Sequence, residues 1–436
     1  MRVKIIMGAG YGDEGKGLMT DYFCYEMNKE YNNWTSHGVT KSRDKVLNVK
    51  VNGGAQAGHT VCRLDKSKGD YKHWVFRQYG SGTFAGADTY LLNTFMLNLI
   101  ELISEYRFLK ETYNINTKLF IDRRCKITLP MDVLMNRLIE DKRTHRHGSC
   151  GLGIYETFHR NNDFKQLTIN DIVKKFIGLT LENFEGYLYE LALQYYDFRL
   201  NELKTNESIE ISIEEYNELL DKTIKMNKEL IQNLAEIGKL DNIAFCNDME
   251  ELIEKYNYKA ILFEGSQGLE LDQYNKRNWP HLTPSNTGLI NSIQEIKNNK
   301  YISNCEVEAC FITRSYKTKH GAGNFVEENS EVQNIYGLYD RTNQPNQYQG
   351  TLKYGLINLG RIKKLITEQL EYTTIIEGKD IKFKVGLAIT HLDQTNSMVL
   401  TQNGNVHFSE IKEMTKGLIN RFYYSFGEKA EDIINE

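Results

Sequence analysis

A strand, a glycine-rich turn and a helix start follow one another in the first twenty residues, and this order restricts the fold more than any other feature. Residues 3–7 are mostly apolar, residues 8–17 read GAGYGDEGKG, and a helical pattern follows from Leu18. Glycines let a backbone curve around an anion, and the N–H groups at a helix start attract phosphate. The segment therefore predicts a phosphate-binding loop.

This loop departs from the common P-loop at one position. Residues 10–16 satisfy the pattern G-x-x-x-x-G-K, but Gly17 stands where a P-loop has the serine or threonine that binds magnesium. Asp13 and Glu14 lie beside the glycines, and a carboxylate there can hold a metal ion or remove a substrate proton. The loop therefore favours a phosphate-transfer enzyme of another kind and argues against a plain GTPase switch.

The remaining sequence predicts an α/β fold with a mostly parallel central sheet flanked by helices. Short β-branched or apolar runs that end in glycine or polar turns predict strands at residues 3–7, 118–121, 259–263, 309–313 and 385–390. Helical patterns lie between them, for example at residues 91–109 and 356–370, and this alternation is typical of parallel sheets. Loops at the carboxyl ends of the strands are expected to carry the site.

We expect one domain over residues 1–436, with a helical insert at residues 160–257. The insert is rich in Glu, Lys, Asn and Tyr, and its apolar residues recur at helical spacing between residues 213 and 234. Its charged face is most simply a solvated surface.

Composition excludes several classes of protein. The 54 Lys and Arg residues are balanced by 58 Asp and Glu residues, which gives no basic surface for nucleic acid. No stretch of 18 apolar residues predicts a membrane span, and residues 3–7 are too short for a signal segment. The seven cysteines are odd in number and form no C-x-x-C pair, so a reduced, cytoplasmic chain is expected.

A second glycine-rich segment identifies a family resemblance. Residues 53–60 read GGAQAGHT and place His59 after a flexible loop. Together with GDEGKG at residues 12–17, this segment resembles the two characteristic motifs of adenylosuccinate synthetases. Further matches occur at residues 81–82, 148–153, 263–268 with Asp272, 283–287, 313–314, 320–323 and 390–393. The resemblance covers nearly the whole chain apart from the insert.

The resemblance implies a carbon–nitrogen ligase. Asp13 would take the proton from N1 of a 6-oxopurine monophosphate, and O6 would then attack the γ-phosphate of a nucleoside triphosphate. His59 would stabilise or protonate the transferring group. The amine of L-aspartate would displace the 6-phosphoryl group, with release of nucleoside diphosphate and phosphate.

The resemblance also implies how the phosphates and the metal ion are bound. Lys16 and the loop amides would neutralise phosphate charge, and the remaining residues assigned to this loop are Gly12, Glu14, Gly15 and Gly17. Magnesium would be held by Asp13 and the carbonyl of Gly58.

Further residues are assigned to the substrates by the same resemblance. Gln56, Gln267 and Thr283 would bind the monophosphate and its base, and Ser149 would replace a family threonine at the 5′-phosphate. The family's arginine-rich stretch for the carboxylates of aspartate is reduced here to residues 349–358, in which Thr351 and Lys353 remain candidates.

Cations for aspartate can also come from a second segment. Arg314, Lys317 and Lys319 lie in a stretch longer than the usual family version and could supply the missing charge.

Two substrate choices stay open. His391 replaces the lysine that usually precedes the guanine-reading carboxylate, whereas Asp393 is retained, so the donor is GTP or ATP.

The change at His391, the longer segment from Arg314 and a missing proline before Ser81 resemble the viral branch, which converts dGMP to N6-succino-2-amino-2′-deoxyadenylate on the route to 2-aminoadenine DNA. That branch commonly replaces the catalytic aspartate by a small residue, but Asp13 is present. The monophosphate is therefore IMP or dGMP, and the location is the cytoplasm of a cell or of a viral host.

The altered stretch at residues 349–358 motivates an alternative in which the chain is a catalytically weakened nucleotide-binding regulatory protein. The family resemblance also implies a homodimer whose site borrows an arginine from the neighbouring subunit, and Arg160 is a candidate for that arginine.

Overall fold

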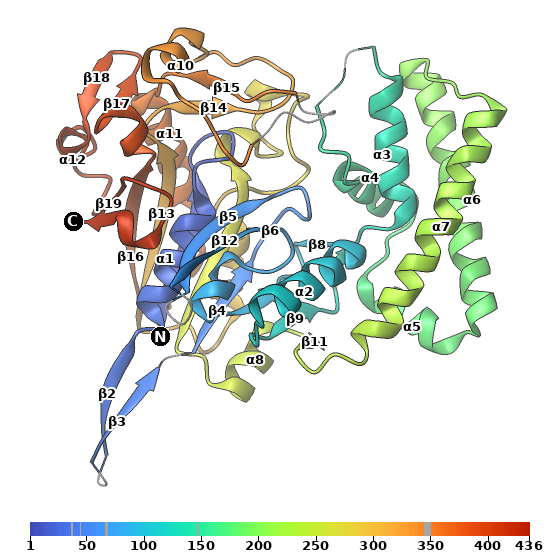
Figure 1. The fold of residues 1–436 in the computed structure, drawn as a ribbon, viewed down its shortest axis with the longest axis horizontal. Coiled ribbons are helices and arrows are strands. Elements are labelled where there is room, and N and C mark those ends of the chain that lie inside the picture. The colour runs from blue at the N-terminus through green and yellow to red at the C-terminus, as the bar shows by residue number, and fades with distance from the viewer. Residues whose placement is uncertain (36–37, 44, 66–68, 145, 147, 344–349) are drawn as a thin grey trace.

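The fold is built on one ten-stranded sheet (Figure 1). The computed structural model describes residues 1–35, 38–43, 45–65, 69–144, 146, 148–343 and 350–436. The strand order is β11-β9-β7-β4-β12-β1-β13-β16-β19-β20, and every pairing is parallel except that of β19 with β20. This is the α/β architecture that the sequence predicts.

The strands of this sheet differ in length, and most are largely buried. Their bounds are β1 (Arg2–Gly8), β4 (Val46–Lys50), β7 (Asp88–Leu91), β9 (Leu119–Asp122), β11 (Ile243–Cys246), β12 (Ala260–Gly268), β13 (Cys305–Arg314), β16 (Ile381–Thr390), β19 (Arg421–Ser425) and β20 (Ile433–Asn435). All five strands expected from apolar runs are present, in β1, β9, β12, β13 and β16. Because β1 lies between β12 and β13, the glycine-rich loop after it opens near the middle of the sheet.

Helices cover both faces of the sheet. Their bounds are α1 (Lys16–Met27), α2 (Leu99–Tyr113), α3 (Pro130–Lys142), α4 (Ile154–His159), α5 (Ile169–Gly178), α6 (Leu181–Glu207), α7 (Ile213–Ile237), α8 (Met249–Tyr256), α9 (Ile290–Asn298), α10 (Ser330–Tyr336), α11 (Leu359–Leu370) and α12 (Ile411–Met414). In β1, Ile5 and Met7 belong to a core with α8, α9 and α11, whereas Ile6 belongs to a core with α1. Successive side chains of a strand point to opposite faces of the sheet, so β1 contributes apolar residues to the core on each face.

The helical insert packs beside the sheet, where Figure 1 shows α3 to α7 grouped together. The long helices α6 and α7 share an apolar core with α2 and α3. Thr180 and Ser212 cap their first turns by accepting backbone hydrogen bonds. Of the expected range 160–257, the part after Ile237 differs from the prediction, because residues 243–246 form β11, an edge strand paired with β9.

The two helices expected from periodicity begin later than predicted. The pattern at residues 91–109 starts inside β7, and α2 begins only after Asn98, whose side chain accepts the backbone N–H of Glu101. Likewise α11 begins after Asn358, which caps the N–H of Arg361. Asparagine favours the cap over the helix interior, so it sets these boundaries.

Smaller two-stranded sheets complete the fold. They pair β2 (Glu30–Thr35) with β3 (Gly38–Arg43), β5 (His59–Asp65) with β6 (Asp70–Phe76), β8 (Met96–Leu97) with β10 (Lys126–Ile127), β14 (Lys317–Lys319) with β15 (Lys353–Gly355), and β17 (Met398–Thr401) with β18 (Gly404–His407). Within the described ranges, no helix has the length and apolar character needed to cross a bilayer.

Candidate active site

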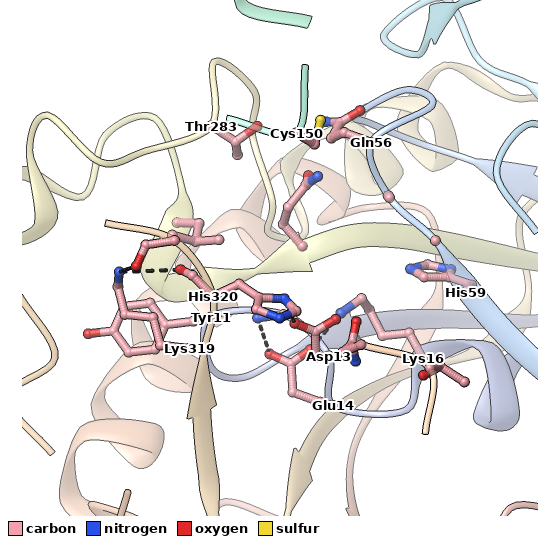
Figure 2. A pocket seen from close by; sticks show the side chains of 18 of the residues that line it. Tyr11, Asp13, Glu14, Lys16, Gln56, His59, Cys150, Thr283, Lys319 and His320 are labelled. Atoms are coloured by element: carbon pink, nitrogen blue, oxygen red, sulfur yellow. Dashed lines mark hydrogen bonds and ion pairs between the residues drawn. The ribbon is translucent and has the colours of Figure 1, made fainter. Parts of the chain in front are cut away.

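One cavity of about 1590 Å³ opens at the glycine-rich loop. Of the residues predicted for the site, those that line it are Gly12, Asp13, Glu14, Gly15, Lys16, Gly17, Gln56, Gly58, His59, Ser149, Gln267, Thr283, Arg314, Lys319, His391 and Asp393. Figure 2 shows Gln56, Cys150 and Thr283 on the side of the cavity opposite Asp13 and Glu14. Segments far apart in the sequence therefore meet at the carboxyl end of β1, as expected for an open α/β sheet.

The loop after β1 takes a conformation that glycine allows. Gly12 and Gly15 have positive φ angles of 97° and 95°, in the region that costs other residues strain. Asp13, between them, also has a positive φ of 61°. A non-glycine residue held there is an unusual backbone feature at a candidate site.

Glu14 folds back onto its own loop. Its carboxylate accepts the N–H of Gly10 at 3.0 Å and of Gly12 at 2.8 Å, and it pairs with the Lys16 ammonium at 2.5 Å. Glu14 and Lys16 are both about 3% exposed. The carboxylate thus fixes the curve of the loop and the position of Lys16.

Asp13 is held from two sides by cations or potential cations. Its Oδ2 lies 3.2 Å from Nδ1 of His320, and its backbone carbonyl accepts a hydrogen bond from Nε of Arg314 at 2.5 Å. Burial alone would raise the pKa of Asp13, but His320, Arg314 and Lys16 outweigh it and lower that pKa. The carboxylate is therefore ionised at neutral pH and can accept a proton or bind a cation.

His59 forms part of a buried network with Glu264 of β12. Nδ1 of His59 lies 2.5 Å from Oε1 of Glu264, which also accepts a hydrogen bond from the hydroxyl of Ser81. The other oxygen of Glu264, Oε2, accepts the backbone N–H of Ser81. Burial would raise the pKa of Glu264, yet Lys50 and the bonds from His59 and Ser81 lower it to about 2.

Burial also lowers the pKa of His59, despite its contact with Glu264. The pair is therefore a neutral imidazole held by an ionised carboxylate. Since Glu264 is an acceptor only, Nδ1 of His59 carries the hydrogen of this contact.

Several buried polar groups of the cavity wall have no protein partner among the described residues. They include both amide atoms of Gln56, Oε1 of Gln267 and Nε2 of His320. A buried polar atom without a partner costs free energy, and native proteins keep few of them. Their presence in one cavity with Asp13, Lys16 and His59 indicates a surface prepared for a polar ligand.

Ser149 and Thr283 lie in this cavity, but Ser149 is already hydrogen bonded. Its hydroxyl exchanges hydrogen bonds with the side-chain amide of Asn136, at 2.9 and 3.3 Å. It also accepts the N–H of Gly151 at 3.4 Å. These bonds fix the loop at residues 148–153 against α3.

The residues expected at the donor base line the same cavity. His391 has a positive φ of 61°, and its Nδ1 lies 2.8 Å from the hydroxyl of Thr390. Burial, with Arg314 nearby, holds the pKa of His391 well below its ordinary value, so this ring is neutral. Burial raises the pKa of Asp393.

Only some of the candidates for aspartate recognition line the cavity. Gln349, at the start of the altered stretch, lies outside the described residues, and Thr351 and Lys353 do not line the cavity. Arg314 does line it, but its guanidinium pairs with Asp340 at 2.5 Å.

The two lysines near Arg314 also differ in position. Lys317 lies away from the cavity wall, 3.2 Å from the buried carboxylate of Glu327. Lys319 lines the cavity, and burial together with Lys353 lowers its pKa to about 8.

Arg160 is unsuitable as an arginine for a neighbouring subunit. Its side chain is fully buried, and its guanidinium binds Asp132 at 2.8 and 2.9 Å and the carbonyl of Ile127 at 2.7 Å. The expectation for Arg160 was therefore wrong. Arg160 lies at the start of the segment expected to form a helical insert with a solvated face. Nothing in the sequence indicated that Arg160 forms an ion pair inside its own subunit.

Sequence reasoning missed three residues that act directly on the predicted ones. His320 contacts Asp13, Glu264 binds His59, and Ser81 binds Glu264. All three lie within segments that match the family, but no role was assigned to them. A buried carboxylate following an apolar run, as in residues 260–264, is the signal that could have pointed to Glu264.

The cavity offers ligands suited to a magnesium ion. Mg²⁺ is usually bound by one or two carboxylates together with substrate phosphates and water. Asp13 supplies one ionised carboxylate, and Gly58 lines the same cavity with its backbone. The described residues contain no cluster of three metal-binding side chains, so phosphate oxygens would have to complete the coordination.

Comparisons with known proteins agree on one family. Residues 5–344 match the family model of adenylosuccinate synthetase. The adenylosuccinate synthetase of Limosilactobacillus reuteri is 26% identical over 329 residues, which cover 74% of this chain and 64% of that protein. The Borrelia turicatae enzyme is 25% identical over 384 residues, covering 84% and 74%. The match thus spans slightly less than two thirds of the length of the first relative.

Solved structures share the fold at low sequence identity. The fully ligated adenylosuccinate synthetase of Plasmodium falciparum has a TM-score of 0.63 and 16% identity, and the alignment covers 100% of both chains. The succinoaminodeoxyadenylate synthetase of cyanophage S-2L, bound to dGMP and to dATP as an energy donor, has a TM-score of 0.57 and 12% identity, covering 99% of this chain and 95% of that one.

Proposed function

Because the chain belongs to the adenylosuccinate synthetase family, we propose that it is a ligase that joins L-aspartate to the 6-position of a purine monophosphate. The energy comes from a nucleoside triphosphate, and the product is a succinylated nucleotide. IMP and dGMP are the candidate monophosphates, and ATP and GTP are the candidate donors. The observation that carries this proposal is the cavity that joins Asp13, Lys16 and His59 to the amide of Gln56 and to Oε1 of Gln267, which have no partner among the described residues.

Asp13 is the group that removes the N1 proton in this proposal. Its carboxylate is ionised, and the positive φ fixes it at the tip of the loop. Loss of the N1 proton places negative charge on O6, which makes O6 a nucleophile toward the γ-phosphate. Phosphorylation then converts a poor leaving group into one that the aspartate amine can displace.

His59 stabilises the group that is transferred. Its Nδ1–H is held by the ionised Glu264, so the imidazole is fixed in one orientation. Negative charge that develops on the transferring group next to Nε2 of His59 favours protonation of Nε2. The carboxylate of Glu264 then stabilises the positive charge of the imidazolium. Lys16, held by Glu14, supplies a fixed positive charge to the phosphates.

Asp13 and the carbonyl of Gly58 are the protein groups that would hold Mg²⁺. When bound, the ion neutralises negative charge on the phosphates of the donor. Asp393 is suited to read the donor base, because a carboxylate accepts hydrogen bonds from ring and exocyclic N–H groups. We also propose a homodimer; since Arg160 is buried, the arginine of a shared site must be another residue.

Product formation tests the proposal. Purified protein is incubated with L-aspartate, Mg²⁺ and either ATP or GTP, and IMP and dGMP are offered separately. Mass spectrometry is expected to detect a succinylated nucleotide together with an equal amount of phosphate. The variant Asp13→Asn, which cannot take the proton, is expected to abolish product while nucleotide binding persists.

A regulatory nucleotide-binding protein is the second candidate. It is favoured by the position of Thr351 and Lys353 outside the cavity, since the family captures aspartate with this stretch. The wild-type protein is tested with both monophosphates and both donors. If it binds nucleotide in every combination but forms no succinylated product, the result supports this candidate and contradicts the ligase.

A further inference from the structure

Arg77 directly follows β6, and its backbone is fixed from two sides. Its N–H donates a hydrogen bond to Oε1 of Glu105 at 3.0 Å, and its carbonyl accepts one from the ammonium of Lys50 at 3.2 Å. The residue lines the cavity of the candidate active site. These contacts therefore hold Arg77 at a defined position of the cavity wall.

The guanidinium of Arg77 has unused hydrogen-bond donors. Over the described ranges of the chain, its one hydrogen bond goes from Nη1 to the carbonyl of Ala55 at 2.8 Å, and no carboxylate pairs with it. Arg314 of the same wall, by contrast, pairs with Asp340. Because a guanidinium carries five N–H donors, most of those of Arg77 remain for a ligand.

A second polar group without a partner lies beside this guanidinium. Ala55, whose carbonyl Arg77 binds, immediately precedes Gln56, and both side-chain amide atoms of Gln56 are buried without a partner among the described residues. Burial raises the pKa of the Cys150 thiol to about 11, and the nearby positive charge of Arg77 acts in the opposite direction. The cation is therefore close to both Gln56 and Cys150.

We propose that Arg77 binds the 5′-phosphate of the purine monophosphate, together with the side-chain amide of Gln56. The inference rests on the proposed function, in which Asp13 takes the N1 proton. The N1 edge of the purine then lies at Asp13, and the phosphate lies at the other end of the nucleotide, beyond the ribose. Figure 2 shows Gln56 and Cys150 on the side of the cavity opposite Asp13, which is the side that this end of the nucleotide would reach.

A phosphate monoester suits these groups better than the other anions of the reaction. The planar fork of arginine donates parallel hydrogen bonds to two phosphate oxygens, and a side-chain amide adds further N–H donors. The amine of L-aspartate must reach C6, next to N1, so its carboxylates belong at the end of the cavity near Asp13. The phosphates of the donor are assigned to Lys16 and its loop.

The test compares the equilibrium Kd of each monophosphate with that of its nucleoside, IMP with inosine and dGMP with deoxyguanosine. Arg77→Met removes the charge and keeps an unbranched side chain, and it is expected to raise the Kd of the monophosphates by about tenfold to 100-fold. The Kd of the nucleosides, measured by ligand-observed NMR, should not change, because they carry no phosphate. Arg77→Lys keeps the charge without the fork and is expected to retain part of the affinity.

Lys72→Met is the matched control, since Lys72 is another cation of β6 but does not line the cavity. It should leave all these constants unchanged. If Arg77→Met weakens the binding of nucleosides as much as that of monophosphates, Arg77 only supports the loop through Ala55, and the assignment is wrong. It is also wrong if Arg77→Met binds monophosphates normally, or mainly raises the Kd of ATP and GTP or the KM for L-aspartate.

Equilibrium binding without L-aspartate separates this inference from the proposed function. If the wild type forms no product but binds monophosphates more tightly than nucleosides, and Arg77→Met abolishes that difference, the ligase proposal fails and the assignment of Arg77 stands. If product forms and the difference between monophosphate and nucleoside is the same in Arg77→Met as in the wild type, the ligase proposal stands and the assignment of Arg77 fails.

Discussion

The contact between His59 and Glu264 shows how much of the chemistry depends on one buried carboxylate. Glu264 lies at 0% exposure and holds the imidazole, while Lys50 and Ser81 keep it ionised. An imidazole without this anchor has no fixed orientation, and its charged form loses its counterion. The anchor belongs to β12 of the ten-stranded sheet and the imidazole to the start of β5, which forms a separate two-stranded sheet with β6, so tertiary packing between the two sheets brings them together.

We expect Glu264→Gln to lower kcat by about 100-fold, because the amide cannot compensate a charged His59. The KM for the monophosphate should change less. Ser81→Ala serves as the control, since it removes one hydrogen bond from Glu264 and leaves the contact with His59. Equal values of kcat in wild type and Glu264→Gln would exclude a role for this pair in the reaction.

Glu264 also makes the free energy of unfolding depend on pH. Its pKa is lowered from 4.5 to about 2 in the folded protein, so the ionised form stabilises the fold by about 3 kcal/mol above pH 4.5. This contribution is lost as the pH falls from 4.5 toward 2. Urea titrations of wild type and Glu264→Gln are therefore expected to differ most near neutral pH and to converge on acidification. A constant difference across this window would contradict the linkage.

At the level of elements, the cavity depends on the close approach of two loops. Gly148 has a positive φ of 77°, and a Cβ at this position would meet the backbone of Gly321 and Ala322 at 2.8 to 3.4 Å. The loop after α3 and the loop after β14 therefore fit together only with glycine here. Both loops line the cavity, so their separation controls its width.

Gly148→Ala is expected to raise the KM for the monophosphate several-fold, because the two loops must move apart. Gly337→Ala is the matched control: Gly337 has a positive φ of 62°, but a Cβ there meets nothing within 4 Å. Both changes carry a backbone cost of about 1 kcal/mol, which denaturant titration measures. A similar KM in the two variants would show that the contact between the loops does not shape the site.

The elements also show what the sequence could and could not predict. The strand–loop–helix at residues 2–27 follows from local pattern alone, because glycine, apolar runs and a helix start all lie in one segment. The pairing of β11 with β9 could not be predicted, since it joins residues more than one hundred positions apart. The contact of His320 with Asp13 depends in the same way on tertiary packing, which a single sequence does not display.

For the whole molecule, the helical insert is attached through buried charges as well as apolar packing. Arg160 pairs with Asp132, and Arg199 of α6 pairs with Glu156 of α4, and all four side chains are buried. Removing one partner of a buried pair leaves the other charge without compensation. These pairs therefore fix the orientation of the insert against the cavity wall, which includes Glu156 and Tyr155.

Arg160→Leu is expected to destabilise the protein by about 3–5 kcal/mol. Denaturant unfolding measures this change, and Arg143→Leu, which removes a partly exposed ion pair with Glu207, should cost less. Mixing Arg160→Leu with an inactive Asp13→Asn chain should not restore activity through a shared site. If mixing the two variants restored activity, and Arg160→Leu had the same free energy of unfolding as the wild type, Arg160 would act on a neighbouring subunit.

In the proposed reaction, one oxygen atom passes from the purine to the released phosphate. If O6 of the purine attacks the γ-phosphate and the aspartate amine then displaces the phosphoryl group, the released phosphate carries the oxygen that began at C6. The most direct measurement therefore uses IMP and dGMP labelled with ¹⁸O at the 6-position and analyses the phosphate by mass spectrometry. We predict one ¹⁸O atom in each phosphate that accompanies a succinylated product. Unlabelled phosphate would mean that water, and not O6, attacks the donor, and this result would contradict the proposed function.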